Sequence, residues 1–348
     1  MYKKIFILSL ISILIASCCC GPSRVSFQAL ESAEISLPQN VQKILVINRY
    51  RPTKQNNWGN IIEGMLTGEK PMQDRRGAEA ALSGMEAQLL QSPRFSIVHA
   101  NEELFGTGTA WFPEPLSSDV ILDLCKRYNT DAVVCLEAFD SDKQFQLTPQ
   151  YHPAVESSKT AAYTSYIAKR SAQITVCWRL YEGKTANLLD EHRMSNQDTW
   201  TREDRVQQNA INGLPNEVTV MENLGRVSGA KYANRIAPNW VTISRKIYTK
   251  GDESFKTGKR YMETKKYDDA IAIYKTALQN PKSKIQGKAA YNIAVAFECK
   301  SDLKEAKSWA SKAYNDYGFK DGLSYTHTID ARIEDQERVE KQMKSKEK

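Results

Sequence analysis

The run Lys43-Ile44-Leu45-Val46-Ile47-Asn48 decides how the N-terminal half of the chain folds. Its uninterrupted aliphatic residues between polar ends are typical of a short strand that is buried on both faces of a sheet. Downstream, residues 75–91 carry apolar side chains at spacings of three and four, which predicts an amphipathic helix that ends at Ser92-Pro93. A second strand is predicted at 95–98. This alternation of strand and helix predicts a mixed α/β domain.

Further elements extend the same domain. In chain order, the sequence predicts a helix at 118–128, a buried strand at 131–139, a hairpin at 172–195, a polar helix at 199–212, a helix at 221–236 and a last strand or extended connector at 240–248. The helix at 221–236 carries Gly225, Gly229 and Ala233 beside its apolar stripe, and small residues at this spacing permit close packing on a sheet. The sequence therefore places a domain with a mixed sheet at residues 41–248.

Two polar stretches interrupt these elements. Residues 49–73 are rich in Gly, Asn and Pro, and predict a long loop. Residues 140–168 are rich in Tyr, Ser, Thr and Gln, and predict either a loop or a peripheral hairpin. At the start of this second stretch Asp140 and Asp142 flank Ser141, and we interpret the two carboxylates as part of a solvated loop rather than as cation ligands.

The N-terminal residues predict export and attachment to a membrane. Lys3 and Lys4 precede an apolar stretch at 5–16, which is typical of a signal peptide and too short to span a bilayer permanently. The sequence Ile15-Ala16-Ser17-Cys18 then resembles the lipobox of bacterial lipoproteins, in which cleavage leaves a cysteine that carries diacylglycerol. We therefore predict a signal peptide at 1–17, lipidation at Cys18 and a lipidated tether at 18–40.

The residues after Cys18 indicate which membrane holds the anchor. Cys19-Cys20-Gly21-Pro22 has no aspartate at the second position and no acidic run, and by the lipoprotein sorting rules this favours the outer membrane, facing the periplasm. An envelope compartment permits disulfides, so the disulfide status of Cys19 and Cys20 stays open. The remaining cysteines, Cys125, Cys135, Cys177 and Cys299, lie in apolar segments, which predicts buried free thiols.

Composition and motifs exclude several classes of function. The chain has 348 residues and a net charge of +7, but its basic residues are interspersed with acidic ones, so no nucleic-acid-binding stripe is predicted. No two cysteines have the CxxC spacing of zinc or thioredoxin-like sites. The sequence contains no P-loop, no Gly-x-Ser-x-Gly and no His-Glu-x-x-His motif, and its four histidines lie far apart. We therefore predict no catalytic residue, no metal and no cofactor.

The C-terminal part of the chain repeats itself with an offset of 36 residues. Small, aromatic and alanine positions of the first unit recur in the second, as Gly258, Tyr261, Tyr267, Ala270, Tyr274 and Ala277, and then as Ala294, Phe297, Leu303, Ala306, Ala310 and Ala313. This series resembles the tetratricopeptide repeat, in which alanines let paired helices approach closely. We predict two such repeats at 252–316, forming an all-α array of helical hairpins, with a capping helix and a charged tail at 317–348.

The N-terminal domain also resembles a known group. Its order of elements, together with residues 89–98, 129–134 and 178–185, is similar to envelope lipoprotein domains of the curli-secretion-channel and penicillin-binding-protein-activator type. With the lipobox and the repeats, the chain resembles a Bacteroidetes-type lipoprotein family that joins such a domain to C-terminal tetratricopeptide repeats. The resemblance implies a fold and an envelope location, and it assigns no activity and no catalytic residues.

Two sets of residues are candidates for binding. Paired helices of this repeat usually form a groove for extended peptides, where the exposed candidates are Lys259, Lys266, Asn292 and Lys300. A basic groove would favour acidic segments or C-terminal carboxylates. The other set follows the first strand, where α/β folds commonly build sites, and comprises Arg49, Arg51, Trp58, Glu63, Asp74 and Arg75.

The sequence supports two hypotheses about function. The favoured one is a non-enzymatic envelope lipoprotein that is held at the membrane through Cys18 and acts as a scaffold for protein partners at its repeats. The alternative is a polymer-binding, sugar-binding or hydrolytic envelope protein with a site in residues 49–74 or 140–168. The identity of the partner and the oligomeric state stay open.

Overall fold

The computed structural model describes residues 23–52, 70–106, 110–158 and 160–344. The described chain forms two compact units. One unit, which we call the sheet unit, holds residues 29–241 with 334–344, and the other, the helical unit, holds residues 23–28 with 242–333. Across the described ranges, no helix combines the length and the apolar character that a bilayer crossing requires.

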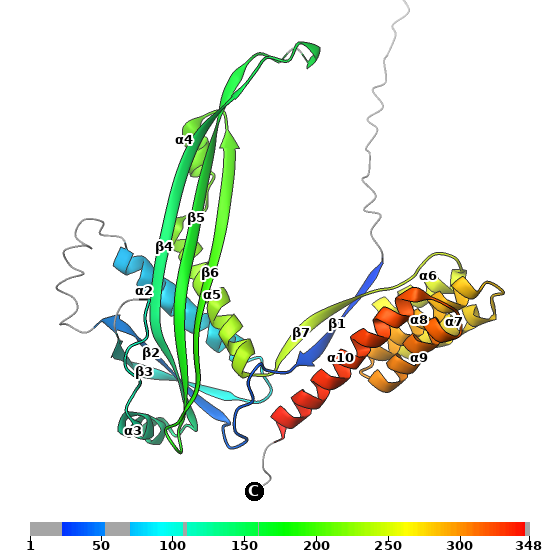
Figure 1. Cartoon of the computed structure of the whole chain (residues 1–348), viewed down its shortest axis with the longest axis horizontal. Coiled ribbons are helices and arrows are strands. Elements are labelled where there is room, and N and C mark those ends of the chain that lie inside the picture. Colours follow the sequence, from blue (N-terminus) through cyan, green and yellow to red (C-terminus); the bar gives the residue numbers. More distant parts are fainter. Residues whose placement is uncertain (1–22, 53–69, 107–109, 159, 345–348) are drawn as a thin grey trace, which may run out of the picture. The chain divides into compact units, whose positions relative to one another are not determined.

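The sheet unit is built on a mixed five-stranded sheet with the order β3-β2-β4-β5-β6 (Figure 1). Its strands are β2 (Lys43–Pro52), β3 (Ser96–Gly106), β4 (Ala132–His152), β5 (Tyr163–Glu182) and β6 (Leu188–Asp204). β2 pairs in parallel with β3 and with β4, and the other pairs are antiparallel. The mixed sheet predicted from the aliphatic runs is confirmed.

Helices cover both faces of the central strands. They are α2 (Lys70–Leu89), α3 (Ser118–Tyr128), α4 (Gln207–Asn212) and α5 (Glu217–Ile236). Ile44 and Val46 of β2 belong to the core under α2 and α5, whereas Leu45 and Ile47 belong to the core under α3. Successive side chains of a strand point to opposite faces, so this aliphatic run fills two cores at once.

Small residues bring α2 and α5 into very close contact. A Cβ atom added at Gly225 would lie 2.3 Å from the carbonyl oxygen of Gly77, and one added at Gly229 would lie 1.8 Å from that of Ala81. The sequence predicted close packing of the 221–236 helix on a sheet. The structure corrects this, because the glycines face the backbone of helix α2.

β4, β5 and β6 continue far beyond β2 as a three-stranded ribbon, with Val155 and Thr160 bridging near its tip and a short 3₁₀ helix (Glu156–Ser158) beside them. Residues 140–168 therefore form the hairpin that the sequence left as one of two alternatives. The predicted helix at 199–212 is wrong, since residues up to Asp204 belong to β6 and only 207–212 are helical. Thr199 and Trp200 pair there with Ser171 and Arg170 of β5.

A separate two-stranded sheet joins β1 (Arg24–Glu31) to β7 (Asn239–Lys246). Within the helical unit, the Ile247 amide donates to the Ser23 carbonyl at 2.9 Å, and Gln28 Nε2 donates to Thr242 Oγ1 at 2.8 Å. The prediction of an unstructured tether at 18–40 is therefore wrong over residues 24–31. Buried and exposed residues alternate along β1, which is the pattern of a strand.

The helical unit contains two helical hairpins and a long helix. In order these are α6 (Glu253–Glu263), α7 (Tyr267–Thr276), a 3₁₀ turn (Ala277–Gln279), α8 (Ser283–Cys299), α9 (Leu303–Asn315) and α10 (Lys320–Met343), of which residues 320–333 belong to this unit. Tyr325 and Ile329 of α10 are buried in the same core as the alanines of α8 and α9.

The two hairpins match each other at the offset of 36 residues. α6 and α8 end at Glu263 and Cys299, and the left-handed residues Lys265 and Ser301 follow, with φ of 59° and 63°. The turns also share hydrogen bonds, because the Lys266 amide donates to Tyr261 at 2.9 Å and the Asp302 amide to Phe297 at 3.0 Å. The internal repeat read from the sequence is therefore present in the backbone.

Candidate functional site

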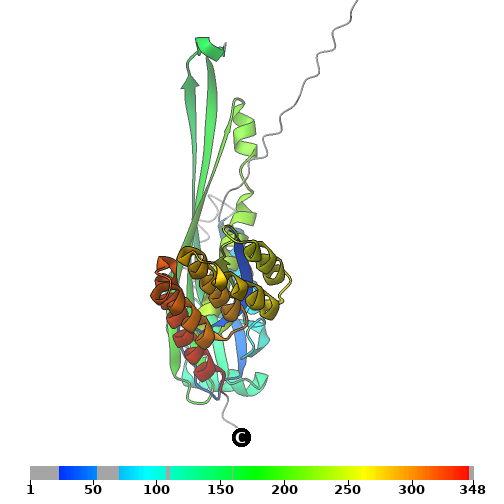
Figure 2. The same cartoon turned by 90° about the vertical axis from the view of Figure 1, so that its right-hand side faces the viewer.

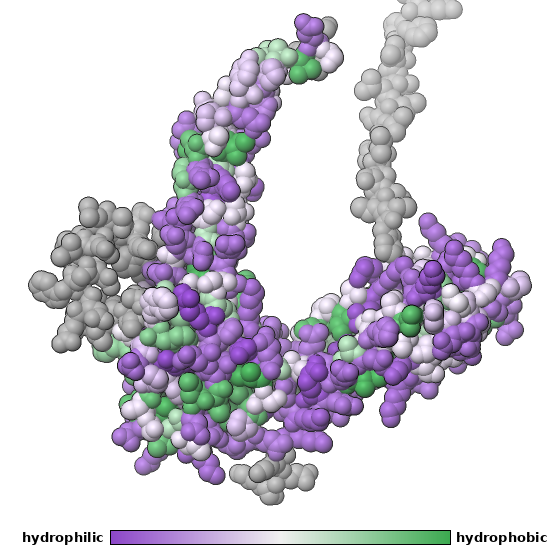
Figure 3. All heavy atoms as spheres, viewed as in Figure 1, coloured by the Kyte–Doolittle hydropathy of each residue, from purple (hydrophilic) through white to green (hydrophobic). Residues whose placement is uncertain are grey.

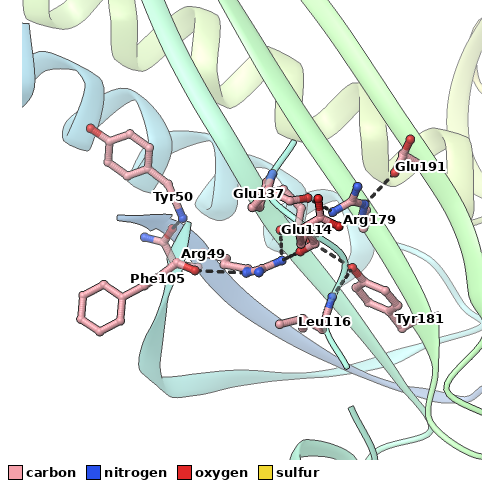
Figure 4. A network of polar contacts seen from close by, with 11 residues as sticks. Arg49, Tyr50, Phe105, Glu114, Leu116, Glu137, Arg179, Tyr181 and Glu191 are labelled. Carbon is pink, nitrogen blue, oxygen red and sulfur yellow. Dashed lines mark hydrogen bonds and ion pairs between the residues drawn. The ribbon is translucent and has the colours of Figure 1, made fainter. Parts of the chain in front are cut away.

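A fully buried carboxylate lies on β4, the central strand of the five-stranded sheet (Figure 4). Glu137 occupies an irregularity between Leu136 and Ala138 of β4, and its side chain is 0% exposed. Arg49 Nη1 lies 2.8 Å from one carboxylate oxygen, and the Tyr181 hydroxyl donates to the other at 3.0 Å. Arg179 Nη1 lies 3.9 Å from the carboxylate oxygen that accepts from Tyr181.

The same side chains bind the backbone of residues 112–116. Arg179 Nη1 donates to the Pro113 carbonyl at 2.6 Å, and its guanidinium stacks 4.6 Å from the centre of the Phe112 ring. Arg49 Nη1 donates to the Glu114 carbonyl at 2.7 Å. The Leu116 amide donates to the Tyr181 hydroxyl at 3.2 Å. The cluster therefore fastens a connecting segment across the sheet.

Electrostatics make this cluster a poor catalytic centre. Burial raises the pKa of Glu137, and the nearby guanidinium groups of Arg49 and Arg179 oppose that rise by favouring the carboxylate. Burial also raises the pKa of the Cys135 thiol well above its usual range and that of Cys177 to about 11, so neither is a thiolate at neutral pH. The arrangement holds opposite charges together and fastens the segment at 113–116.

Of the candidate residues between 49 and 75, the three whose side chains the structure describes do not converge on one site. Arg49 joins the Glu137 cluster, Asp74 accepts a hydrogen bond from the Ser141 hydroxyl of β4, and Arg75 pairs with Glu79 on the surface of α2 at 2.9 Å. Trp58 and Glu63 lie outside the described residues, as does the side chain of Arg51.

The candidates on the repeats have different environments. Lys266 is exposed, Lys259 is 3.4 Å from Glu263, and Lys300 pairs with Asp268 of α7. Asn292 was predicted to be exposed, and this is wrong, because its side chain is 0% exposed. Its amide clamps the backbone of Tyr248, accepting from the amide at 2.9 Å and donating to the carbonyl at 2.8 Å. Asn292 is a structural residue.

A serine, a histidine and a glutamate meet near the tip of the ribbon. Ser165 Oγ lies 2.8 Å from His152 Nε2 and donates to Glu203 Oε1 at 2.5 Å. In a hydrolase triad the histidine takes the serine proton, and the carboxylate binds the far imidazole nitrogen. Here the Ser165 hydroxyl donates to the carboxylate, and His152 Nε2 lies 3.4 Å from the same carboxylate oxygen, so the arrangement differs from a triad and the group links three strands.

The sequence predicts buried free cysteines and no metal site. Cys125, Cys135 and Cys177 are free and buried, as predicted, and Cys299 is free and half-buried. Cys18, Cys19 and Cys20 lie outside the described residues. Among the residues that the structure places, no group of three or more His, Cys, Asp or Glu side chains is arranged to hold a metal ion.

Sequence reasoning missed the Glu137 cluster. A signal was present, because Glu137 and Arg179 are charged residues inside runs that predict buried strands, and such residues are almost never fully buried unless they are paired. The register then brings them together, since Arg179 stands opposite Cys135, two residues before Glu137.

These features define a chain with a helix-covered mixed sheet, a long β-ribbon and a region of repeated helical hairpins. The chain belongs to the family described as Domain of unknown function (DUF8603), which matches residues 41–248. Residues 256–343 match a second family, Domain of unknown function (DUF6340). No curated protein matches the chain.

Several solved structures show a partial likeness. The PelC dodecamer from Paraburkholderia phytofirmans is 10% identical over 61% of this chain and 98% of its own, with a TM-score of 0.24. Lipoprotein GNA1162 from Neisseria meningitidis is 13% identical over 56% and 99%, with a TM-score of 0.20. A minor lipoprotein from Acinetobacter baumannii is 10% identical over 57% and 89%, with a TM-score of 0.19. TM-scores of this size do not establish a shared fold.

Proposed function

We propose that the protein is a lipid-anchored, non-enzymatic envelope lipoprotein that binds partner proteins through its helical unit. The observation that carries the proposal is the repetition, at an offset of 36 residues, of the turns and the buried positions of the hairpins α6–α7 and α8–α9. Equivalent positions have equivalent burial, since Ala270 and Ala306 are both 0% exposed, as are Tyr274 and Ala310. Repeated hairpins that share one core are the architecture of tetratricopeptide arrays, whose extended surfaces bind peptides.

The charge of this surface indicates the kind of partner. Lys259, Lys266 and Lys300 remain candidates, whereas Asn292 is excluded by its burial. Ammonium groups form charge-assisted hydrogen bonds with carboxylates, so the lysines favour an acidic peptide segment or a C-terminal carboxylate. The charged groups of the Glu137 cluster are used in fastening the chain, so we assign them no catalytic role.

Substitution of the three candidate lysines tests the partner. We expect Lys259→Ser, Lys266→Ser and Lys300→Ser together to remove specific proteins from a crosslinking pull-down performed on membranes. A control variant with the same loss of charge carries Lys126→Ser, Lys184→Ser and Lys341→Ser, and it should retain them. Point variants are preferable to truncation after Tyr248, since truncation removes Glu298, which binds Arg245 at 2.7 Å. Equal capture by both variants would rule out the lysine surface.

The anchor is tested separately. Cys18→Ser is expected to abolish labelling by a clickable fatty acid and to move the protein from the membrane pellet to the soluble fraction, because acyl chains supply about 0.8 kcal/mol of membrane affinity per buried CH₂. Cys19→Ser is the matched control and should keep both the label and the pellet. Membrane attachment of the Cys18→Ser protein would contradict the lipid anchor. The sequence after Cys18 supports attachment to the outer membrane on its periplasmic face.

A further inference from the structure

Over the middle of the β4-β5-β6 ribbon, no described element of the sheet unit covers one of its two faces. α2, α4 and α5 lie on the opposite face, as Figures 1 and 2 show from two directions. On the face turned away from these helices, α3 and residues 112–116 cover only the end of the ribbon beside β2, which we call the proximal end. They do so through contacts to Tyr181 and Arg179. Above that end, the space-filling view in Figure 3 shows a mostly hydrophilic ribbon.

The strand register places six polar side chains on this uncovered face in two rows. The rows are Asp142, Gln173 and Gln197, and then Gln144, Ser171 and Thr199. We call these six residues the polar patch. The patch lines a hollow of about 270 Å³. A regular array of this kind follows from the pleat, because alternate residues of three paired strands share one face.

The patch offers hydrogen-bonding groups that the described part of the protein leaves unused. The side-chain amides of Gln144, Gln173 and Gln197 are exposed and have no hydrogen-bond partner among the described residues. Among the described residues, the hydroxyls of Ser171 and Thr199 bond only to each other, at 3.1 Å. Each amide can donate twice and accept twice, so the three glutamines together present donors and acceptors side by side.

An exposed aromatic ring stands further down the same face. Trp111 is 68% exposed, and the guanidinium of Arg193 lies 4.9 Å from the centre of its ring. Arg193 precedes Gln197 by four residues on β6, which is about 13 Å along a strand. Both side chains have the same parity on β6 and hence share its face. The Trp111 ring and the amides of the polar patch therefore lie on the same face of the ribbon.

We propose that the polar patch, with Trp111 at its proximal end, binds an uncharged glycan chain. Sugar hydroxyls both donate and accept, so they match amides and hydroxyls, and the apolar face of a sugar ring packs against an aromatic side chain. An apolar protein surface would leave the three amides unsatisfied, which is costly. Asp142 is the only charged residue of the patch, and the hollow is also lined by Lys143 and Asp198, so its lining carries no excess positive charge that would favour an anionic polymer. This inference does not depend on the proposed role of the helical unit.

Binding is measured on the full chain in a detergent without a sugar headgroup. The probes are maltohexaose, cellohexaose and chitohexaose, with polygalacturonate as the anionic comparison, and binding is detected by saturation-transfer NMR and quantified by titration. We expect at least one neutral hexasaccharide to bind. Gln173→Ala with Gln197→Ala should raise its Kd about tenfold, since each removes net hydrogen-bond energy, and Trp111→Ala should do the same.

The matched control is Gln91→Ala with Gln207→Ala, which removes two exposed glutamines outside the patch. This variant should bind the sugar with an unchanged Kd, and circular dichroism should show the same thermal unfolding for all variants. The proposal is overturned if none of the three neutral sugars binds, if the patch variants bind like the control, or if polygalacturonate binds more tightly than every neutral sugar.

Discussion

Gly229→Val is expected to lower the free energy of unfolding of the sheet unit by about 3 kcal/mol or more, at the upper end of the cost of overpacking. The new Cβ would lie 1.8 Å from the Ala81 carbonyl oxygen and 2.7 Å from the Met85 amide nitrogen. Both atoms belong to the backbone of α2 and cannot rotate away. The helices must separate, and Leu82 and Leu224 then lose packing in the core that they share.

Chemical denaturation followed by circular dichroism measures this change. Gly213→Ala is the matched control, because its added Cβ meets nothing closer than 3.2 Å and one of those neighbours is the flexible side chain of Arg202. We expect the control to cost less than about 1 kcal/mol, as do most substitutions outside the core. If Gly229→Val unfolds at the same denaturant concentration as the parent, α2 and α5 do not pack through their glycines.

The central strands could be predicted because their sequence reflects burial. Leu45 and Ile47 fill one core while Ile44 and Val46 fill the other, so all four must be apolar, and the run is visible without any knowledge of partners. Gly225 and Gly229 likewise indicated close packing. The sequence analysis expected these glycines to face a sheet, whereas they face helix α2. Close approach requires small residues in both cases, so the sequence alone does not distinguish them.

Only part of the ribbon could be predicted, because the half that lies far from β2 buries few apolar side chains. Residues such as Gln144 and Gln146 are exposed, and this part of β4 is held mainly by pairing with β5. Backbone pairing leaves no hydrophobic periodicity, so the sequence resembles a loop. β1 was missed although Val25, Phe27 and Ala29 alternate with polar residues, and its partner β7 lies more than two hundred residues away in the chain.

The Glu137 cluster was hidden for a geometric reason. Its members come from β2, β4 and β5, and only the strand register brings Arg49 and Arg179 to the same carboxylate. No local motif marks such a cluster. What the sequence does show is a charged residue inside each of two aliphatic strands, and a search for complementary charges in neighbouring buried strands would have proposed the pair.

Arg179→Met is expected to lower the free energy of unfolding of the sheet unit by about 3–5 kcal/mol at neutral pH, as removal of one partner from a buried ion pair does. The guanidinium is 5% exposed, and its loss leaves the fully buried Glu137 with Arg49 as its only cation among the described residues. Its bond to the Pro113 carbonyl and its stacking on Phe112 are lost as well.

The pH dependence separates charge from packing. The pKa of Glu137 is raised in the folded protein above its ordinary value of 4.5, chiefly by burial. A raised folded pKa contributes stability that is complete below the unfolded pKa and is lost as the pH rises through the folded pKa. Without Arg179 the pKa rises further, so this loss grows. The difference in stability between Arg179→Met and the parent should therefore be smallest near pH 4 and widen towards pH 8.

A second substitution completes the test. Glu137→Gln in the Arg179→Met background removes the buried charge, and we expect it to restore part of the lost stability at pH 8 and little at pH 4. Denaturation of the four proteins of this double-mutant cycle gives the coupling energy directly. A difference that stays constant from pH 4 to pH 8 would mean that Arg179 acts only through contacts other than Glu137, which are its ion pair with Glu191 at 2.7 Å and its contacts to Pro113 and Phe112. Glu137→Gln alone should leave partner capture unchanged, because the cluster fastens the chain and touches no partner in the proposed function.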